Sequence, residues 1–216
     1  MIEIVVLALL AGFIALRLIS VLGRHDESAE PQQPLQRNAA RPEESNVITL
    51  TPTERPPLAL PDNLNDSARS GLEAIADEDP TFDPAAFVEG SQQAYRMILE
   101  AFWAGDKDAL TNLVSDDVAE DFAAAIDARE ADDNSYENKF VDVENAEIVS
   151  AARRGSMAEV TVRFDAELAT VTRDADGNVV AGSETDTVQT HDIWTFSRHL
   201  GSDDPAWLLI ETDGAD

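Results

Sequence analysis

Asp192 is the residue in this chain whose type and surroundings best fit catalysis. It shares strand parity with Trp194 and Phe196, so we expect its carboxylate on the apolar face of a strand. A carboxylate in an apolar pocket can serve as a general base, with a tyrosine donating to the oxyanion that forms. Tyr95 and Tyr136 are the two tyrosines that can fill this second role. These residue types predict, at most, proton abstraction from an apolar substrate.

Asp192 also fits a purely structural role. No spacing requires it to converge with either tyrosine, and the neighbouring His191 points to the opposite face of the strand. A partly buried carboxylate is ordinarily hydrogen-bonded to backbone or paired with a cation, for which Arg163 or Arg96 is available. The sequence favours this structural interpretation of Asp192.

Other common chemistries find no matching residues. The 216-residue chain contains no Cys and three His, which excludes thiolate nucleophiles and cysteine-ligated zinc and leaves no histidine cluster. The acidic stretch 120–133 lacks the calcium-loop pattern, and residues 174–177 form a turn rather than a cation site. Neither a Gly-rich phosphate loop nor a Gly-x-Ser-x-Gly elbow is present. We expect no cofactor and no metal.

The charge balance restricts the partners. Lys and Arg number 15 against 43 Asp and Glu, which gives a formal net charge of −28. Binding to DNA or RNA needs cations that replace the phosphate counterions, so nucleic acid is excluded as a partner. Docking on anionic lipid by charge is disfavoured for the same reason.

Residues 83–216 are predicted to form a single α+β domain. Asp83 and Pro84 mark the start of a helix that ends at Gly105, and Asp106 and Ser115 cap two further helices. The stretch 130–138 is polar and is predicted to be a loop. After residue 139 the spacing of the apolar residues changes from a helical period of about 3.6 to a strand period of 2. Strands are expected at 140–151, 157–171, 185–198 and 206–212, with a hairpin turn at 174–178. This order predicts helices packed on one face of a curved antiparallel sheet.

Residues 1–23 are predicted to be a transmembrane anchor. The run from residue 4 to residue 22 is interrupted only by Arg17, and 19 helical residues span about 28 Å, close to the hydrocarbon thickness. Its apolar members include Ile4, Leu7, Leu10, Phe13, Leu16, Leu18 and Val21. Glu3 replaces the cation of a signal peptide, and no small-residue cleavage site follows. A buried core helix is the other alternative.

Positive charge sets the expected orientation. Arg17, Arg24, Arg37 and Arg41 all lie on the C-terminal side of the anchor, and no Lys or Arg precedes it. We expect the N-terminus outside and the rest of the chain in the cytoplasm. Residues 24–80 follow as a proline-rich, acidic linker that is largely disordered, because seven of the ten prolines lie between positions 31 and 61 and apolar residues are scarce. Apolar islands at 47–50 and 58–60 and a weak helical pattern at 64–77 are the exceptions.

Several segments, taken in order and spacing, resemble the C-terminal domain of the mitochondrial inner-membrane import subunit Tim44 and its alphaproteobacterial relatives. They are residues 87–90, 94–98, 113–118, 122–126, 158–164, 192–198 and 204–209. The resemblance covers residues 83–213. It implies a fold like the nuclear-transport-factor-two-like cone, with an apolar pocket between the helices and a curved sheet. The bacterial relatives also begin with a membrane anchor and a variable linker, as this chain does.

The resemblance also implies a function. It implies a non-enzymatic scaffold or adaptor at the bacterial inner membrane, single-pass, which binds a peptide, a membrane-associated protein partner or a lipid in membrane-protein assembly or translocation. No chaperone-recruiting counterpart is visible in residues 24–80, and the net charge of −21 over residues 83–216 argues against lipid binding and a ribosomal role. A small cone-fold enzyme that uses Asp192 as its base is the alternative. The expected pocket residues are Tyr95, Leu99, Phe102, Trp103, Phe164, Asp192, Trp194, Phe196 and Trp207.

Overall fold

The computed structural model describes residues 58–61, 63–132, 134–183, 185–202 and 204–214. The predicted anchor and the linker up to residue 57 lie outside these residues, so the anchor residues Ile4, Leu7, Leu10, Phe13, Leu16, Leu18 and Val21 remain a prediction. Within the described part, no helix is both long enough and apolar enough to cross a bilayer.

The described chain begins with four helices, each with a side-chain cap at its start. They are α2 (Asp66–Glu78), α3 (Pro84–Ala104), α4 (Lys107–Thr111) and α5 (Asp116–Glu130). The Asp83 side chain accepts hydrogen bonds from the backbone of Ala85 and Ala86, and Gly105 ends α3 in the left-handed region at φ 71°. Asp106 and Ser115 cap α4 and α5 in the same way. The three helices predicted after residue 83 are therefore confirmed.

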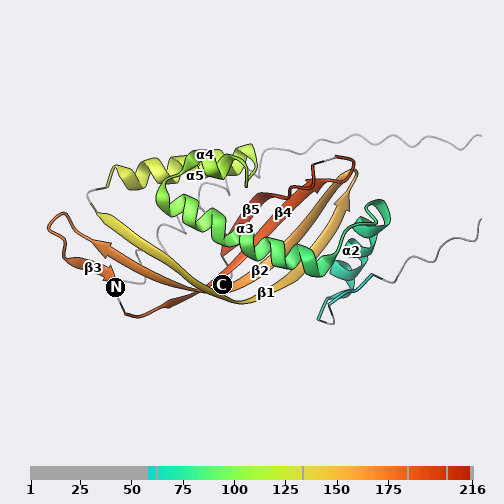
Figure 1. Cartoon of the computed structure of the whole chain (residues 1–216), viewed down its shortest axis with the longest axis horizontal. Coiled ribbons are helices and arrows are strands. Elements are labelled where there is room, and N and C mark those ends of the chain that lie inside the picture. The colour runs from blue at the N-terminus through green and yellow to red at the C-terminus, as the bar shows by residue number, and fades with distance from the viewer. Residues whose placement is uncertain (1–57, 62, 133, 184, 203, 215–216) are drawn as a thin grey trace, which may run out of the picture.

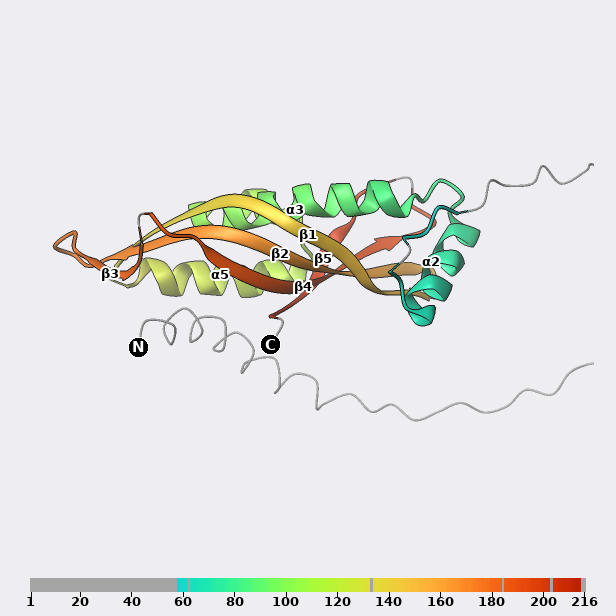
Figure 2. The same cartoon turned by 90° about the horizontal axis from the view of Figure 1, so that it is seen from below.

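Five antiparallel strands follow. They are β1 (Ser135–Arg154), β2 (Met157–Arg173), β3 (Val179–Gly182), β4 (Val188–His199) and β5 (Leu208–Gly214). The order across the sheet is β1-β2-β4-β5, and β3 pairs with the far end of β2. Burial alternates along β2 as the sequence indicates. The strands are long and twisted, and the sheet curves beneath the helices (Figures 1 and 2). The predicted α+β class, with helices on a curved antiparallel sheet, is confirmed.

Two strand predictions were wrong. The loop expected at 130–138 ends at residue 134, because β1 begins at Ser135 opposite Arg173 of β2. The ladder there is held by backbone pairing and by an ion pair between Arg173 and Glu137 at 3.1 Å, with little burial to leave a pattern in the sequence. The short strand β3 was missed for the same reason, since Val179 and Val180 are exposed.

Helix α2 is folded onto the domain, although it lies within residues 24–80, which were predicted to be a largely disordered linker. Its apolar face, Ala68, Leu72, Ile75 and Ala76, is buried. A Cβ atom added at Gly71 would lie 1.9 Å from the carbonyl oxygen of Ala151 in β1, so the helix backbone touches the strand backbone. The folded unit therefore starts before residue 83. The weak helical pattern at 64–77 is confirmed as α2.

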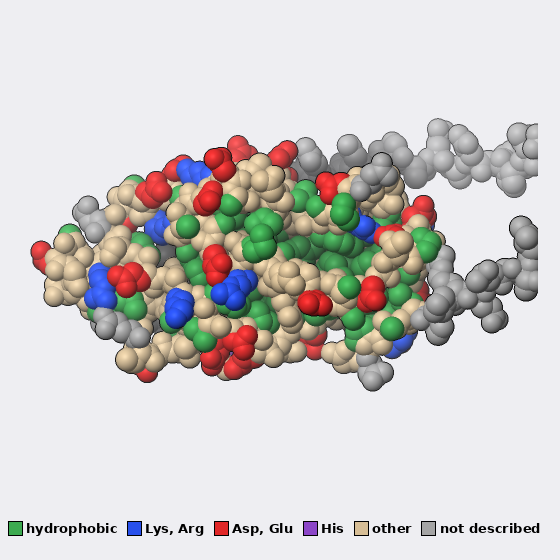
Figure 3. Space-filling model, viewed as in Figure 1, with side chains coloured by type: hydrophobic (Ala, Val, Ile, Leu, Met, Phe, Trp, Pro, Cys, Tyr) green, Lys and Arg blue, Asp and Glu red, His purple; other side chains and the backbone are tan. Residues whose placement is uncertain are grey.

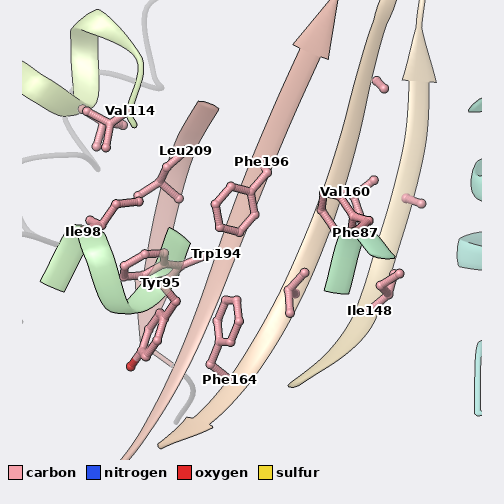
Figure 4. Close-up of a cluster of buried hydrophobic side chains, with 14 of the residues drawn as sticks. Phe87, Tyr95, Ile98, Val114, Ile148, Val160, Phe164, Trp194, Phe196 and Leu209 are labelled. Carbon is pink, nitrogen blue, oxygen red and sulfur yellow. The ribbon is translucent and has the colours of Figure 1, made fainter. Parts of the chain in front are cut away.

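Helix α3 crosses the concave face of the sheet and organises the core. Figure 4 shows Tyr95 of this helix beside Phe164 and Trp194 of the strands, and Ile98 near Leu209. Phe87 lies against Phe196 of β4, with ring centroids 6.2 Å apart. Helices α4 and α5 lie beside the C-terminal part of α3 (Figure 1), and α5 also contacts β5. The beginning and the middle of α3 meet the sheet through different side chains, and both belong to the candidate site.

Candidate functional site

Five of the predicted pocket residues come together under the middle of α3. Tyr95 is fully buried, its ring stacks on Phe164 with centroids 4.5 Å apart, and Trp194 lies against it at 4.6 Å. Phe196 touches both Phe164 and Trp194. The Tyr95 hydroxyl donates a hydrogen bond to Asp192 Oδ2 at 2.6 Å. Strand parity predicted the shared face of Asp192, Trp194 and Phe196 correctly.

The Tyr95–Asp192 pair is enclosed. Burial raises the pKa of the Asp192 carboxyl, against the hydrogen bonds from Tyr95 and Thr190. Burial and the neighbouring Asp192 charge together raise the pKa of the Tyr95 hydroxyl. The Tyr95 hydroxyl therefore keeps its proton and donates it to the Asp192 carboxyl group. The pair has the chemistry of a structural hydrogen bond in the core.

The predicted ionic partners of Asp192 were wrong. Arg163 forms an ion pair with Glu147 on the other face of the sheet, and Arg96 pairs with Glu100 along α3 at 2.8 Å. The helix supplies a tyrosine in place of an arginine, because only a side chain that points inward from α3 reaches the carboxylate. His191 does face the opposite side, where its Nδ1 lies 2.7 Å from Asp165.

The other predicted residues lie elsewhere. Phe102 packs on Phe122 of α5 at 5.2 Å, and Leu99 and Trp103 are partly buried at the same end of α3. Tyr136 donates to Asp132 at 2.6 Å. Trp207 belongs to a separate aromatic group, so the residues predicted as one pocket divide among three places in the fold.

That separate group forms a cleft at the beginning of α3. The cleft has a volume of about 430 Å³, within the range of small ligand sites. Its aromatic wall consists of Phe82, Phe87, Phe196 and Trp207, with Phe87 and Trp207 centroids 4.7 Å apart. Figure 3 shows hydrophobic side chains gathered in a hollow beside α3, on the side where Figure 1 places β4 and β5.

Small residues of α3 keep this cleft open. Ala86, Gly90 and Ala94 recur every four residues and line it, one position behind the inward-facing Phe87 and Ser91. A Cβ atom added at Gly90 would meet no heavy atom within 4 Å. A glycine inside a helix costs about 1 kcal/mol relative to alanine, and here no close packing requires it. Gly90 is itself exposed, so the space beside it is the solvent-facing mouth of the cleft.

An ion pair closes one end of the cleft. Arg198 of β4 pairs with Asp79, and both side chains are mostly buried, at 14% and 13% exposure. The guanidinium also lies 5.2 Å from the ring centroid of Trp207. Burial raises the pKa of Asp79, but the two hydrogen bonds from Thr81 and the Arg198 charge outweigh it and the pKa is lowered. This end of the cleft is rigid and charge-balanced.

The exposed carboxylate of Asp83 gives the cleft an acidic rim. Arg198 is the one cation among the described lining residues, and Asp79 neutralises it. The Asp83 carboxylate also accepts hydrogen bonds from the backbone of Ala85 and Ala86, so it caps α3 as well as lining the mouth of the cleft. The Thr81 hydroxyl at this end of the cleft donates to Asp79 at 2.6 Å. The described residues contain no group of three or more His, Cys, Asp or Glu placed to hold a metal ion.

Sequence reasoning named two residues that line the cleft, Phe196 and Trp207, and missed the others. It placed Phe87 on the buried side of α3 but not in a cavity, and it left Asp79 and Phe82 at the edge of the linker. The repeat of small residues at positions 86, 90 and 94, beside the apolar stripe of α3, was the signal that could have located it.

Comparison with known proteins gives one family. Residues 68–214 match the model of the Tim44-like domain. Among solved structures, the intermembrane space region of the chloroplast protein ARC6 is similar at 10% identity and a TM-score of 0.42, covering 59% of this chain and 95% of that one. A SEC-C-motif protein from Rhodopseudomonas palustris is similar at 16% identity and a TM-score of 0.32, covering 57% and 77%. We base no conclusion on these two low scores. No curated protein matches the chain.

Proposed function

The chain belongs to the Tim44-like domain family, and from this premise we propose that it is a membrane-tethered adaptor, not an enzyme, whose aromatic cleft binds a segment of a partner protein. The family match covers α2, the remaining helices and the sheet. The observation that carries the proposal is the surface cleft of about 430 Å³ beside Phe87 and Trp207 at the beginning of α3.

The proposed tether is the N-terminal part of the sequence. Residues 4–22 would anchor the chain once in the bacterial inner membrane, with the N-terminus outside and the folded domain in the cytoplasm. The linker would then hold the cleft close to membrane-associated partners and raise its effective concentration there. Protease protection of the full chain in sealed inverted and right-side-out vesicles tests this topology. Protection of the C-terminal domain in inverted vesicles would contradict it.

The alternative of catalysis by Asp192 has less support. Asp192 lines neither the aromatic cleft nor the smaller cleft between β1, β2 and residue 183. The Tyr95 hydroxyl, which would have to serve a substrate, is already donated to the carboxylate and is fully buried. The pair is better suited to hold α3 on the sheet.

Site-specific photo-crosslinking in native membranes tests the adaptor role. A photoreactive residue at position 205, an exposed cleft position, should crosslink to a discrete membrane-associated protein. The same residue at Val180, exposed on β3 at the far end of the sheet, serves as the matched control. Gly90→Leu, which fills the cleft, should reduce the crosslink from position 205 at least fivefold. Equal crosslinking from both positions, or no effect of Gly90→Leu, would contradict the proposal, and a crosslink to lipid alone would identify a lipid site instead.

A further inference from the structure

We propose that the docking of α2 on β1 controls the cleft at the beginning of α3. This inference rests on the proposed function, because it concerns the regulation of the same site. Residues 79–83 join α2 to α3, and four of them, Asp79, Thr81, Phe82 and Asp83, line the cleft. Release of α2 from the sheet would therefore move one end of the cleft and weaken the binding of a partner.

Helix α2 is held on β1 along its whole length. At its start, the Asn65 side chain donates to the Val149 carbonyl at 3.1 Å. At its end, Glu78 forms an ion pair with Arg153 at 3.3 Å, and the close backbone contact at Gly71 lies between these two points. A helix of 13 residues is only marginally stable alone in water, so α2 depends on these contacts and on its buried face. The docked and released forms of α2 are the two states of the proposed device.

The connection from α2 to the cleft is short and hydrogen-bonded. The N–H of Asp79 donates to the carbonyl of Ile75, a fully buried residue of α2, at 2.8 Å. The N–H of Phe82 then donates to the Asp79 carbonyl at 3.0 Å, and the Phe82 ring centroid lies 5.9 Å from that of Trp207. Figures 1 and 2 both show α2 next to the beginning of α3. The buried face of α2 is thus linked to the aromatic wall of the cleft through Asp79.

The ion pair of Asp79 makes the two positions interdependent. Asp79 neutralises Arg198, whose side chain is 14% exposed and whose Nε atom is buried with no hydrogen-bond partner among the described residues. Removing one partner of a mostly buried ion pair leaves an uncompensated charge at a high cost in free energy. If Asp79 left with α2, the Arg198 guanidinium would have to turn toward water. Trp207, whose ring centroid lies 5.2 Å from this guanidinium, would then lose its cation.

Fluorine NMR of the full chain labelled with fluorotryptophan tests the coupling, because Trp207 is one of only three tryptophans. Gly71→Ala, which should release α2, should shift or broaden the Trp207 resonance. The double variant Asn65→Ala, Arg153→Gln removes two contacts between α2 and β1 without overpacking, and it should act in the same direction. Ile126→Ala, which opens a cavity in α5, is the matched control and should leave the Trp207 resonance in place.

Arg198→Gln tests the coupling in the reverse direction. Loss of the cation leaves Asp79 without its partner, so α2 should be released more often and the amides of its buried face should exchange at least tenfold faster. The amide of Ile126 in α5 should keep its wild-type rate. Wild-type exchange of α2 in Arg198→Gln, or equal acceleration at Ile126, would overturn the proposal. So would an unchanged Trp207 resonance in a Gly71→Ala protein whose α2 amides exchange faster.

The partner crosslink from position 205 separates this inference from the function on which it rests. If both hold, Gly71→Ala reduces the crosslink at least fivefold and moves the Trp207 resonance, because binding and α2 docking affect each other by the same factor. If only the adaptor function holds, the crosslink persists in Gly71→Ala and the Trp207 resonance is unchanged. If only the coupling is real, the Trp207 resonance moves and no partner crosslink appears in either protein.

Discussion

Helix α3 is tightly packed on the sheet at its middle, whereas a cleft lies between the helix and the sheet at its beginning. At the middle, Tyr95 fills the space against Phe164 and Trp194, and its hydroxyl is bonded to Asp192. One helical turn and a half earlier, Gly90 leaves a cleft above Trp207 that nothing among the described residues fills. The same helix on the same sheet therefore separates the residues that stabilise the fold from those available for binding.

The two helix glycines show the same contrast. Gly71 of α2 has no room for a Cβ atom, because a Cβ built there would lie 1.9 Å from the Ala151 carbonyl oxygen. A Cβ atom at Gly90 of α3, which is exposed, would meet no heavy atom within 4 Å. Close packing therefore requires a glycine at position 71 and does not require one at position 90. The predictions below use this difference.

The largest loss of stability is expected at the middle of α3, where Tyr95 is packed. Tyr95→Ala removes a fully buried ring and leaves Asp192 without its tyrosine donor. Large aromatic-to-alanine changes in a core cost about 3–5 kcal/mol, and we expect a loss of that size. Urea unfolding followed by tryptophan fluorescence measures it. A loss below about 1 kcal/mol would show that the Tyr95 cluster is not the core that its burial indicates.

Gly71→Ala should be the next most damaging change. The added methyl group meets the Ala151 carbonyl and its carbon, which are backbone atoms and cannot rotate away. Overpacking of this kind costs about 1–3 kcal/mol, and α2 should separate from β1. Faster amide hydrogen exchange at Leu72 and Ile75 in the variant would report this directly. Wild-type exchange rates there would mean that α2 is docked less closely than the structure has it.

Asp192 allows a test with two matched variants. Asp192→Ala removes the acceptor of the buried Tyr95 hydroxyl and should cost about 1–3 kcal/mol. Asp192→Asn keeps an acceptor and should cost much less. If both variants are equally stable at pH 7, the hydrogen bond contributes little.

The same pair of variants tests the pH dependence. Burial raises the folded-state pKa of Asp192 above its unfolded value, so the folded protein holds this proton more tightly. Its contribution to stability is therefore fully present below the ordinary carboxyl pKa and is lost as the pH rises through the raised value. Asp79 behaves in the opposite way: its pKa is lowered, so its contribution is lost only as the pH falls below the ordinary range. The stability difference between Asp192→Asn and wild type should shift in favour of the variant as the pH rises through the raised pKa.

Local signals explain what the sequence could predict. A cap such as Asp83, a left-handed glycine such as Gly105 and the alternation along β2 each act within a few residues, so each leaves a pattern in the printed order. The shared face of Asp192 and Trp194 follows from strand parity in the same way. These features predicted the helices, the hairpin and the curved sheet.

The features that were missed depend on distant partners. The helical pattern of α2 was predicted, but its docking on the domain was not, because it depends on contact between Gly71 and Ala151 of β1, which the sequence of the linker alone does not reveal. The start of β1 is fixed by pairing with the end of β2 and carries few buried side chains. The cleft forms between segments that are far apart in the sequence, so no local residue pattern predicts it. Core residues could therefore be named in advance, but their division into a filled region and an open one could not.

The smallest change in stability is expected at the open end, where it should have the opposite sign. Gly90→Ala adds a methyl group that meets no atom and removes the backbone entropy of a helical glycine, so stability should rise by about 0.5–1 kcal/mol. Gly90→Leu should be at least as stable, because its side chain can lie on Phe87 and Trp207 and fill the cleft. Binding of the partner should nevertheless survive Gly90→Ala and be lost in Gly90→Leu. Thermal unfolding together with the crosslinking yield from position 205 measures both properties in the same samples. If Gly90→Ala destabilised the protein, the added methyl group would be meeting other atoms, and the space beside Gly90 would not be open. The contrast between the beginning and the middle of α3 would then disappear.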